Sequence, residues 1–79
     1  MNSNEINIAV LPNSFYLKSS SGKTISEVIL SDLTGKILKQ ITCNENFVEI
    51  YTNSLPAGVY ILRSKIKNEW INTKVIKSN

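Results

Sequence analysis

The 79-residue sequence contains no histidine and a single cysteine, Cys43. Without histidine, the chain lacks the side chain that most often serves as a general base near neutral pH. A single cysteine cannot form a disulfide within the chain, and without histidine it cannot supply the ligand set of a typical zinc site. Apolar runs that approach the roughly 18 residues of a membrane-spanning helix are also absent. We therefore expect no metal site, no cofactor and no transmembrane segment.

The composition favours β-strands within one small domain that spans residues 1–79. Hydrophobic residues make up 42% of the chain, which is typical of a globular rather than a disordered protein. Isoleucine occurs 11 times and valine and threonine five times each, whereas alanine occurs twice. β-Branched residues pack well on a pleated sheet, while a helical domain of this size normally uses more alanine, leucine and glutamate.

Short apolar segments alternate with turn-forming residues along the chain. Within several of them, apolar and polar residues alternate with a period of two, as expected of half-buried strands. Seven strands are predicted, over residues 6–10, 14–18, 25–33, 37–42, 47–52, 59–66 and 70–77. Short strands at this spacing, with no helix between them, indicate an all-β antiparallel sandwich or barrel.

Residues 24–33 also fit a helix. Thr24 and Glu27 have the spacing of a helix capping box, and the apolar residues after them fit one helical face. We favour a strand, because the run is rich in β-branched residues. The residues from Asp32 to Lys36 are then typical of a hairpin turn, in which Gly35 takes a positive φ angle and the Asp32 carboxylate accepts backbone amide protons.

The positive charge is concentrated at the C-terminal end. Nine basic residues against six acidic residues give a net charge of +3. Residues 1–62 hold four lysines and five acidic residues, net −1, whereas residues 63–79 hold five basic residues and Glu69, net +4. A basic segment suggests nucleic acid, but Trp70 and Tyr60 are the only aromatic residues near these charges. We expect no nucleic-acid partner, and we interpret the lysines as the polar faces of two strands, where they also oppose edge-to-edge pairing.

Three short motifs suggest catalysis but lack the residues that it needs. Residues 21–24 resemble the end of a phosphate-binding loop, yet Leu17 stands where that loop requires its first glycine. Ser20 and Lys23 match a serine–lysine pair, but this loop is expected to be exposed, and a lysine base must be buried. Cys43 has no histidine to activate it, and the carboxylates form no obvious acid–base pair. We therefore predict no catalytic residues and no enzyme activity.

Three motifs occur in an order that resembles a known family. They are Ile25-x-x-Val28-x-Leu30-x-Asp32-Leu33-Thr34-Gly35-Lys36-Ile37-Leu38, Leu55-Pro56-Ala57-Gly58-Val59-Tyr60-Ile61-Leu62 and Thr73-Lys74-Val75-Ile76-Lys77. This order resembles the C-terminal sorting domain, type A group, of proteins exported by the bacterial type IX secretion system. Type A domains usually have a Pro-Asn-Pro-like motif before their first strands. Here Pro12-Asn13 is followed by Ser14, so residues 1–24 carry less of the resemblance.

The resemblance implies a small Ig-like antiparallel β-sandwich of about seven strands, without a catalytic role. Such a domain follows a cargo protein fused to its N-terminal side and passes with it through the periplasm of a Gram-negative bacterium. The outer-membrane type IX translocon recognises the domain, and a signal-removing surface protease usually then cleaves it off. The cargo stays on the cell surface or is secreted. The residues after Met1 lack the basic start and apolar core of a signal peptide, so we expect the domain to be the tail of a longer precursor.

The resemblance also assigns roles to individual residues. It implies translocon recognition by the last strand, at Lys74, Val75, Ile76 and Lys77. It implies that a second set shapes the fold: Asp32, Gly35, Lys36, Leu55, Pro56, Gly58 and Tyr60. A terminal strand with an open edge suits recognition by strand addition, in which backbone hydrogen bonds provide affinity and side chains provide specificity.

A β-sandwich accessory binding module of a secreted enzyme, for glycan or protein, is the alternative function. A glycan module would present its aromatic rings as a flat exposed platform, and Trp70, Tyr51 and Tyr16 are the candidates. A buried Trp70 would argue against this alternative. The positions of these three rings in the fold therefore distinguish the two functions.

Overall fold

The computed structural model describes residues 6–20 and 22–78 of the protein. These residues form seven strands and no helix: β1 (Ile6–Leu11), β2 (Ser14–Ser19), β3 (Ile25–Asp32), β4 (Ile37–Glu45), β5 (Phe47–Tyr51), β6 (Gly58–Ile66) and β7 (Glu69–Lys77). Every predicted strand is present. The helical alternative for residues 24–33 is wrong, since β3 covers most of that segment. The main difference in length is β4, which continues past its predicted end at Thr42 to Glu45.

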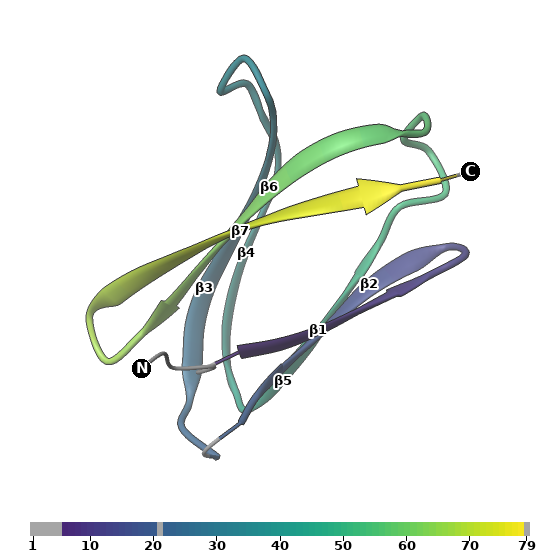
Figure 1. Ribbon diagram of the computed structural model, residues 1–79. Coiled ribbons are helices and arrows are strands. Elements are labelled where there is room, and N and C mark those ends of the chain that lie inside the picture. The colour runs from purple at the N-terminus through teal and green to yellow at the C-terminus, as the bar shows by residue number, and fades with distance from the viewer. Residues whose placement is uncertain (1–5, 21, 79) are drawn as a thin grey trace.

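The strands form two antiparallel sheets that face each other (Figure 1). The three-stranded sheet has the order β1-β2-β5, and the four-stranded sheet has the order β4-β3-β6-β7. Every pair of neighbouring strands in these sheets is antiparallel. The structure thus confirms the predicted all-β, Ig-like antiparallel sandwich.

The core consists of apolar side chains from both sheets that point into the space between them. Because side chains alternate along a strand, every second residue of β5 and of most of β6 is buried. Phe15 of β2 and Tyr60 of β6 meet between the sheets, with ring centroids 6.4 Å apart. Burying one large apolar side chain contributes roughly 1.5–3 kcal/mol, so this layer holds the two sheets together. The buried cluster comprises Phe15, Leu17, Ile25, Val28, Leu30, Val48, Ile50, Tyr60, Leu62, Ile66 and Val75.

Strand β3 is buried on both faces of its sheet. It lies between β4 and β6, and residues 28–31 are all buried. Ile29, only 8% exposed, pairs with Gln40 of β4 and with Arg63 of β6, whose side chain is exposed. A central strand that is covered on both faces has no polar side to alternate with its apolar side. This explains the continuous apolar run that also fitted a helix.

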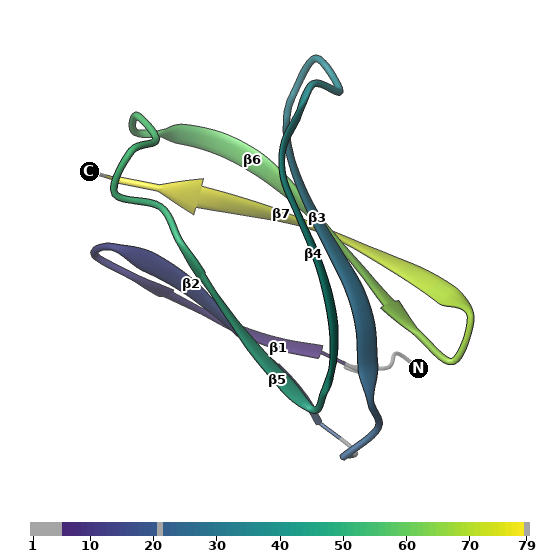
Figure 2. The same ribbon diagram turned by 180° about the vertical axis from the view of Figure 1, so that it is seen from behind.

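The two sheets are connected on one side of the sandwich and open on the other. On the connected side, β4 leads into β5 through Asn46, whose carbonyl oxygen accepts a hydrogen bond from the Ser19 backbone N–H (2.8 Å). On the other side, the edge strands β1 and β7 lie side by side (Figures 1 and 2), but the described backbone forms no ladder between them. We call this side, between Ile6–Leu11 and Glu69–Lys77, the β1–β7 seam. It leaves one edge of each sheet unpaired.

Candidate functional site

The turn between β6 and β7 determines the direction of every backbone and side-chain group in β7. Its two residues, Lys67 and Asn68, have φ angles of 52° and 64°, as the two-residue turns that match the strand twist require. Ile66 and Glu69 pair across the turn, so the backbone hydrogen bonds to β6 recur at every second residue of β7. The alternate residues direct their backbone N–H and C=O groups to the free edge: Trp70, Asn72, Lys74 and Ile76.

The four C-terminal residues predicted for recognition are divided between the two sides of β7. Lys74 and Ile76 point outward, and Ile76 is 60% exposed. Val75 and Lys77 point into the sandwich, and each is only 5% exposed. The expectation that the C-terminal lysines line a polar strand face is therefore wrong for Lys77. Its side chain lies on the same side of the strand as the buried Val75, because the two residues are two positions apart.

The outer face of the four-stranded sheet carries positive charge around an aromatic ring. Trp70 is 40% exposed, and the centre of its ring lies 5.6 Å from the Arg63 guanidinium carbon and 5.7 Å from the Lys65 ammonium. Cations at this distance from an aromatic face are attracted to its π electrons. Lys74 lies farther along the same face of β7. We call Arg63, Lys65, Trp70 and Lys74 the basic face.

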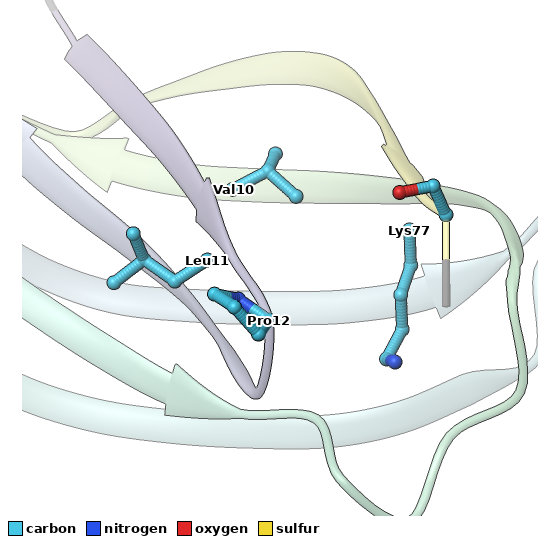
Figure 3. A pocket seen from close by; sticks show the side chains of 5 residues that line it. Val10, Leu11, Pro12 and Lys77 are labelled. Carbon is cyan, nitrogen blue, oxygen red and sulfur yellow. The ribbon is translucent and has the colours of Figure 1, made fainter.

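A hollow of about 350 Å³ lies at the end of the β1–β7 seam, beside the turn that follows β1. Val10, Leu11 and Pro12 line it from the side of the first hairpin, and Lys77 and Ser78 line it from the end of β7 (Figure 3). Val10 and Leu11 are 46% and 41% exposed, although both are apolar. Sequence reasoning did not identify this hollow, because its two sides come from opposite ends of the chain.

The loop between β3 and β4 is organised by one carboxylate. Oδ1 of Asp32 accepts hydrogen bonds from the Thr34 backbone N–H (2.9 Å), the Thr34 hydroxyl (2.6 Å) and the Lys36 backbone N–H (3.1 Å). Gly35 has a φ angle of 92°, and its N–H donates to the Asp32 carbonyl oxygen (3.1 Å). The hydrogen bond from the Thr34 hydroxyl is the main reason that the pKa of Asp32 lies below its ordinary value of 3.8.

The loop between β5 and β6 is fastened to the core by residues of the second motif. The Leu55 backbone N–H donates to the Thr52 carbonyl oxygen (3.0 Å), and the Leu55 side chain packs against the buried cluster. The hydroxyl of the buried Tyr60 donates a hydrogen bond to the carbonyl oxygen of Pro56. Gly58 lies between these two partners and begins β6. These contacts place the residues of the second motif beside the core, and Gly58 and Tyr60 pair with Lys77 and Val75 of β7.

The three aromatic residues considered for glycan binding do not share one surface. Tyr16 and Tyr51 belong to the three-stranded sheet, where the Tyr16 ring stacks on Phe47 with centroids 6.0 Å apart. Trp70 is not buried, but it belongs to the outer face of the four-stranded sheet. The flat platform that a glycan module would need is therefore not formed by this set.

Two polar side chains considered for chemistry, Cys43 and Glu49, are hydrogen-bonded within the fold. In residues 6–20 and 22–78, no three histidine, cysteine or acidic side chains gather as metal ligands. Burial raises the pKa of the Cys43 thiol, which donates to the Ile25 carbonyl oxygen (3.1 Å), so the reactive thiolate is disfavoured. The Glu49 carboxylate accepts a hydrogen bond from the Ser14 hydroxyl (2.7 Å). Over the same ranges, no helix has the length and apolarity to cross a membrane.

Comparison with protein families gives one decisive match. The family model described as the secretion system C-terminal sorting domain matches residues 2–78. The chain belongs to this family of sorting domains. The match includes the N-terminal region in which Pro12-Asn13 is followed by Ser14. A comparison with curated proteins found no match.

Membership gives the sorting domain its general function. It is a C-terminal sorting signal of type IX secretion, so it interacts with the type IX secretion machinery. Domains of this family act as signals rather than as catalysts. Type IX sorting implies export to the cell surface or secretion.

Replacing Gly35 tests the backbone conformation of the β3–β4 loop of the sorting domain. We expect Gly35→Ala to lower the free energy of unfolding by about 1–2 kcal/mol, because an alanine side chain disfavours a positive φ angle. Steric crowding is not the cause, since no atom outside Gly35 and its two chain neighbours lies within 4 Å of the position that a Cβ atom would occupy. Gly35→Asn should cost less, because asparagine adopts this conformation more readily. Urea unfolding measures both variants, and an alanine variant as stable as the wild type contradicts the expectation.

The Asp32 carboxylate should make the stability of the sorting domain depend on pH. Its folded-state pKa lies below the ordinary value of 3.8, so its contribution is complete above that value and is lost as the pH falls through the folded-state pKa. We therefore expect Asp32→Asn to be less stable than the wild type at neutral pH and equally stable in strong acid. Chemical denaturation at both pH values measures the difference. If the difference in unfolding free energy between the wild type and Asp32→Asn is the same in strong acid, the carboxylate is not its cause.

Replacing Tyr60 tests the anchor of the β5–β6 loop. Tyr60→Phe keeps the buried ring and removes the hydroxyl that donates to Pro56, so we expect a loss of about 1 kcal/mol in unfolding free energy. Tyr51→Phe is the matched control, because Tyr51 is 61% exposed and its loss of a hydroxyl should change stability by less than about 0.5 kcal/mol. Thermal and urea unfolding compare the two variants. Equal effects would mean that the bond to Pro56 adds nothing to stability.

Proposed function

We propose that this domain directs a cargo protein, fused to its N-terminal side, across the outer membrane of a Gram-negative bacterium. The outer-membrane type IX translocon binds the domain along the free edge of β7. The observation that carries this proposal is the unpaired edge itself, at which Trp70, Asn72, Lys74 and Ile76 direct their backbone groups away from β6. The function is recognition, and the domain performs no chemistry of its own.

Strand addition is the mode of binding that this edge supports. A segment of the translocon that lies beside β7 would extend the four-stranded sheet to a fifth strand, with its backbone bonded to the four outward groups of β7. Lys74 and Ile76 would then lie beside outward-facing side chains of the added strand, and Val75 and Lys77 beside inward-facing ones. All four predicted recognition residues would contribute, but from two faces of the sheet.

The basic face supports the approach of the partner. Arg63, Lys65 and Lys74 lie on the outer face next to the β7 edge, and their charges attract an acidic surface before contact is made. Trp70 adds a partly exposed ring to the same face. We expect the translocon to present acidic groups around the segment that pairs with β7.

Removal of the domain is the last step of the proposed export. After transfer through the periplasm and across the outer membrane, a signal-removing surface protease separates the domain from its cargo. The cargo is then retained on the cell surface or released. The domain therefore acts before cleavage, as a folded domain that the secretion machinery recognises.

An export assay tests recognition at the β7 edge. The domain is fused behind a signal peptide and a reporter in a bacterium with a type IX system, and a fusion that lacks residues 73–79 defines the background. Asn72→Pro removes one N–H from the free edge without removing a bond to β6, and edge strands tolerate proline at such positions. We expect surface reporter to fall roughly two- to tenfold, the equivalent of one lost hydrogen bond.

Asn72→Ala is the matched control, because it removes the side chain and keeps the amide. It should be exported like the wild type. Circular dichroism and thermal unfolding establish that both variants are folded. A folded Asn72→Pro domain that is exported as well as the wild type would contradict recognition through the β7 edge, and a reporter that reaches the surface equally well without residues 73–79 would contradict sorting by the last strand.

A further inference from the structure

The Lys77 side chain occupies an unusual position for a lysine at the end of an edge strand. It points into the sandwich, is only 5% exposed, and lines the hollow at the end of the β1–β7 seam (Figure 3). Within residues 6–20 and 22–78, its ammonium group has no hydrogen-bond or ion-pair partner.

The chemistry of the hollow is incomplete. The other residues that line it in the described part of the chain are Val10, Leu11, Pro12 and Ser78, none of which is acidic. A lysine side chain as buried as this one gains from a partner for its ammonium group, and an added carboxylate would both pair with it and accept its hydrogen bonds. The apolar side chain of Val10, which is 46% exposed, provides a surface for an aliphatic group. The hollow therefore suits a carboxylate on a short apolar stem.

The location of the hollow identifies the source of that carboxylate. It lies at the end of the free edge of β7, alongside which an added strand would run. Cross-strand neighbours have Cβ atoms about 4.5–5.5 Å apart and share the same face of the sheet. A residue of the added strand opposite Lys77 would therefore point inward, toward the hollow.

We infer that the hollow is a carboxylate-binding subsite, in which Lys77 pairs with an inward-facing aspartate or glutamate side chain on the extended translocon segment that binds β7. Val10 contacts the aliphatic part of that side chain or its inward-facing neighbour. This inference rests on the proposed function, and it names the chemistry that the partner must carry. It also assigns Lys77 a role that differs from that of Lys74, which faces outward in the basic face.

Export of Lys77 variants tests the pairing. Lys77→Met keeps most of the stem and removes the charge, so we expect surface reporter to fall about tenfold or more, while the melting temperature of the domain stays the same or rises. Lys77→Arg should restore most of the export, because a guanidinium also pairs with a carboxylate. Lys74→Met, which removes a charge from the outer face, is the matched control and should reduce export less than Lys77→Met.

The outcomes separate this inference from the proposed function. If Lys77→Met is exported like the wild type while folded Asn72→Pro is not, the subsite is overturned and edge recognition stands. If neither variant loses export, both are overturned. Equal losses for Lys77→Met and Lys74→Met would assign the effect to overall charge and overturn the subsite.

A direct probe decides the question even if Lys77→Met fails to fold. The wild-type domain is titrated with 4-methylpentanoate, and the methyl signals of Val10 are followed by NMR. We expect saturable shifts in the millimolar range, and none with the uncharged 4-methylpentanamide. Equal shifts with acid and amide, or no shifts with either, would overturn a carboxylate subsite at Lys77.

Discussion

The two-residue turn at Lys67 and Asn68 is the constraint on which the C-terminal part of this domain depends. Its positive φ angles fix the register of β7 against β6. In a sheet, a slip of one residue moves every side chain to the opposite face. Such a slip would turn Trp70 inward and Val75 outward. The basic face, the buried side of β7 and the place of Lys77 at the hollow are therefore consequences of one hairpin geometry.

The edge of β7 has to avoid unspecific strand pairing and still bind the correct partner. An unpaired edge is open to any strand, and proteins protect such edges with lysines and with charges that point inward. Lys74 and Lys77 fit these two descriptions. A strand that places an apolar side chain against Lys77 would leave a charge buried and unpaired, whereas an acidic one would neutralise it. The same residue thus discourages unspecific pairing and, in the proposed subsite, selects the correct partner.

The local features of the fold were predictable because their causes are local. Period-two alternation and β-branched residues placed all seven strands, and the spacing of Asp32, Thr34 and Gly35 predicted a turn that the Asp32 carboxylate now organises. The run at residues 25–33 was ambiguous for a physical reason. Its strand is covered on both faces, so the sequence shows neither a polar side nor a clear period.

The amino-acid sequence by itself determined the strands, their turns, the excess of positive charge after residue 62 and the order of family motifs. These depend on residues close together in the chain. Only the tertiary structure decided which strands became edges, that β1 and β7 lie side by side, and that Lys77 lines a hollow with Val10 and Leu11. The reason is that the two sides of the seam come from opposite ends of the chain. The distance between β1 and β7 depends on how two complete sheets pack, and a local sequence pattern cannot predict it.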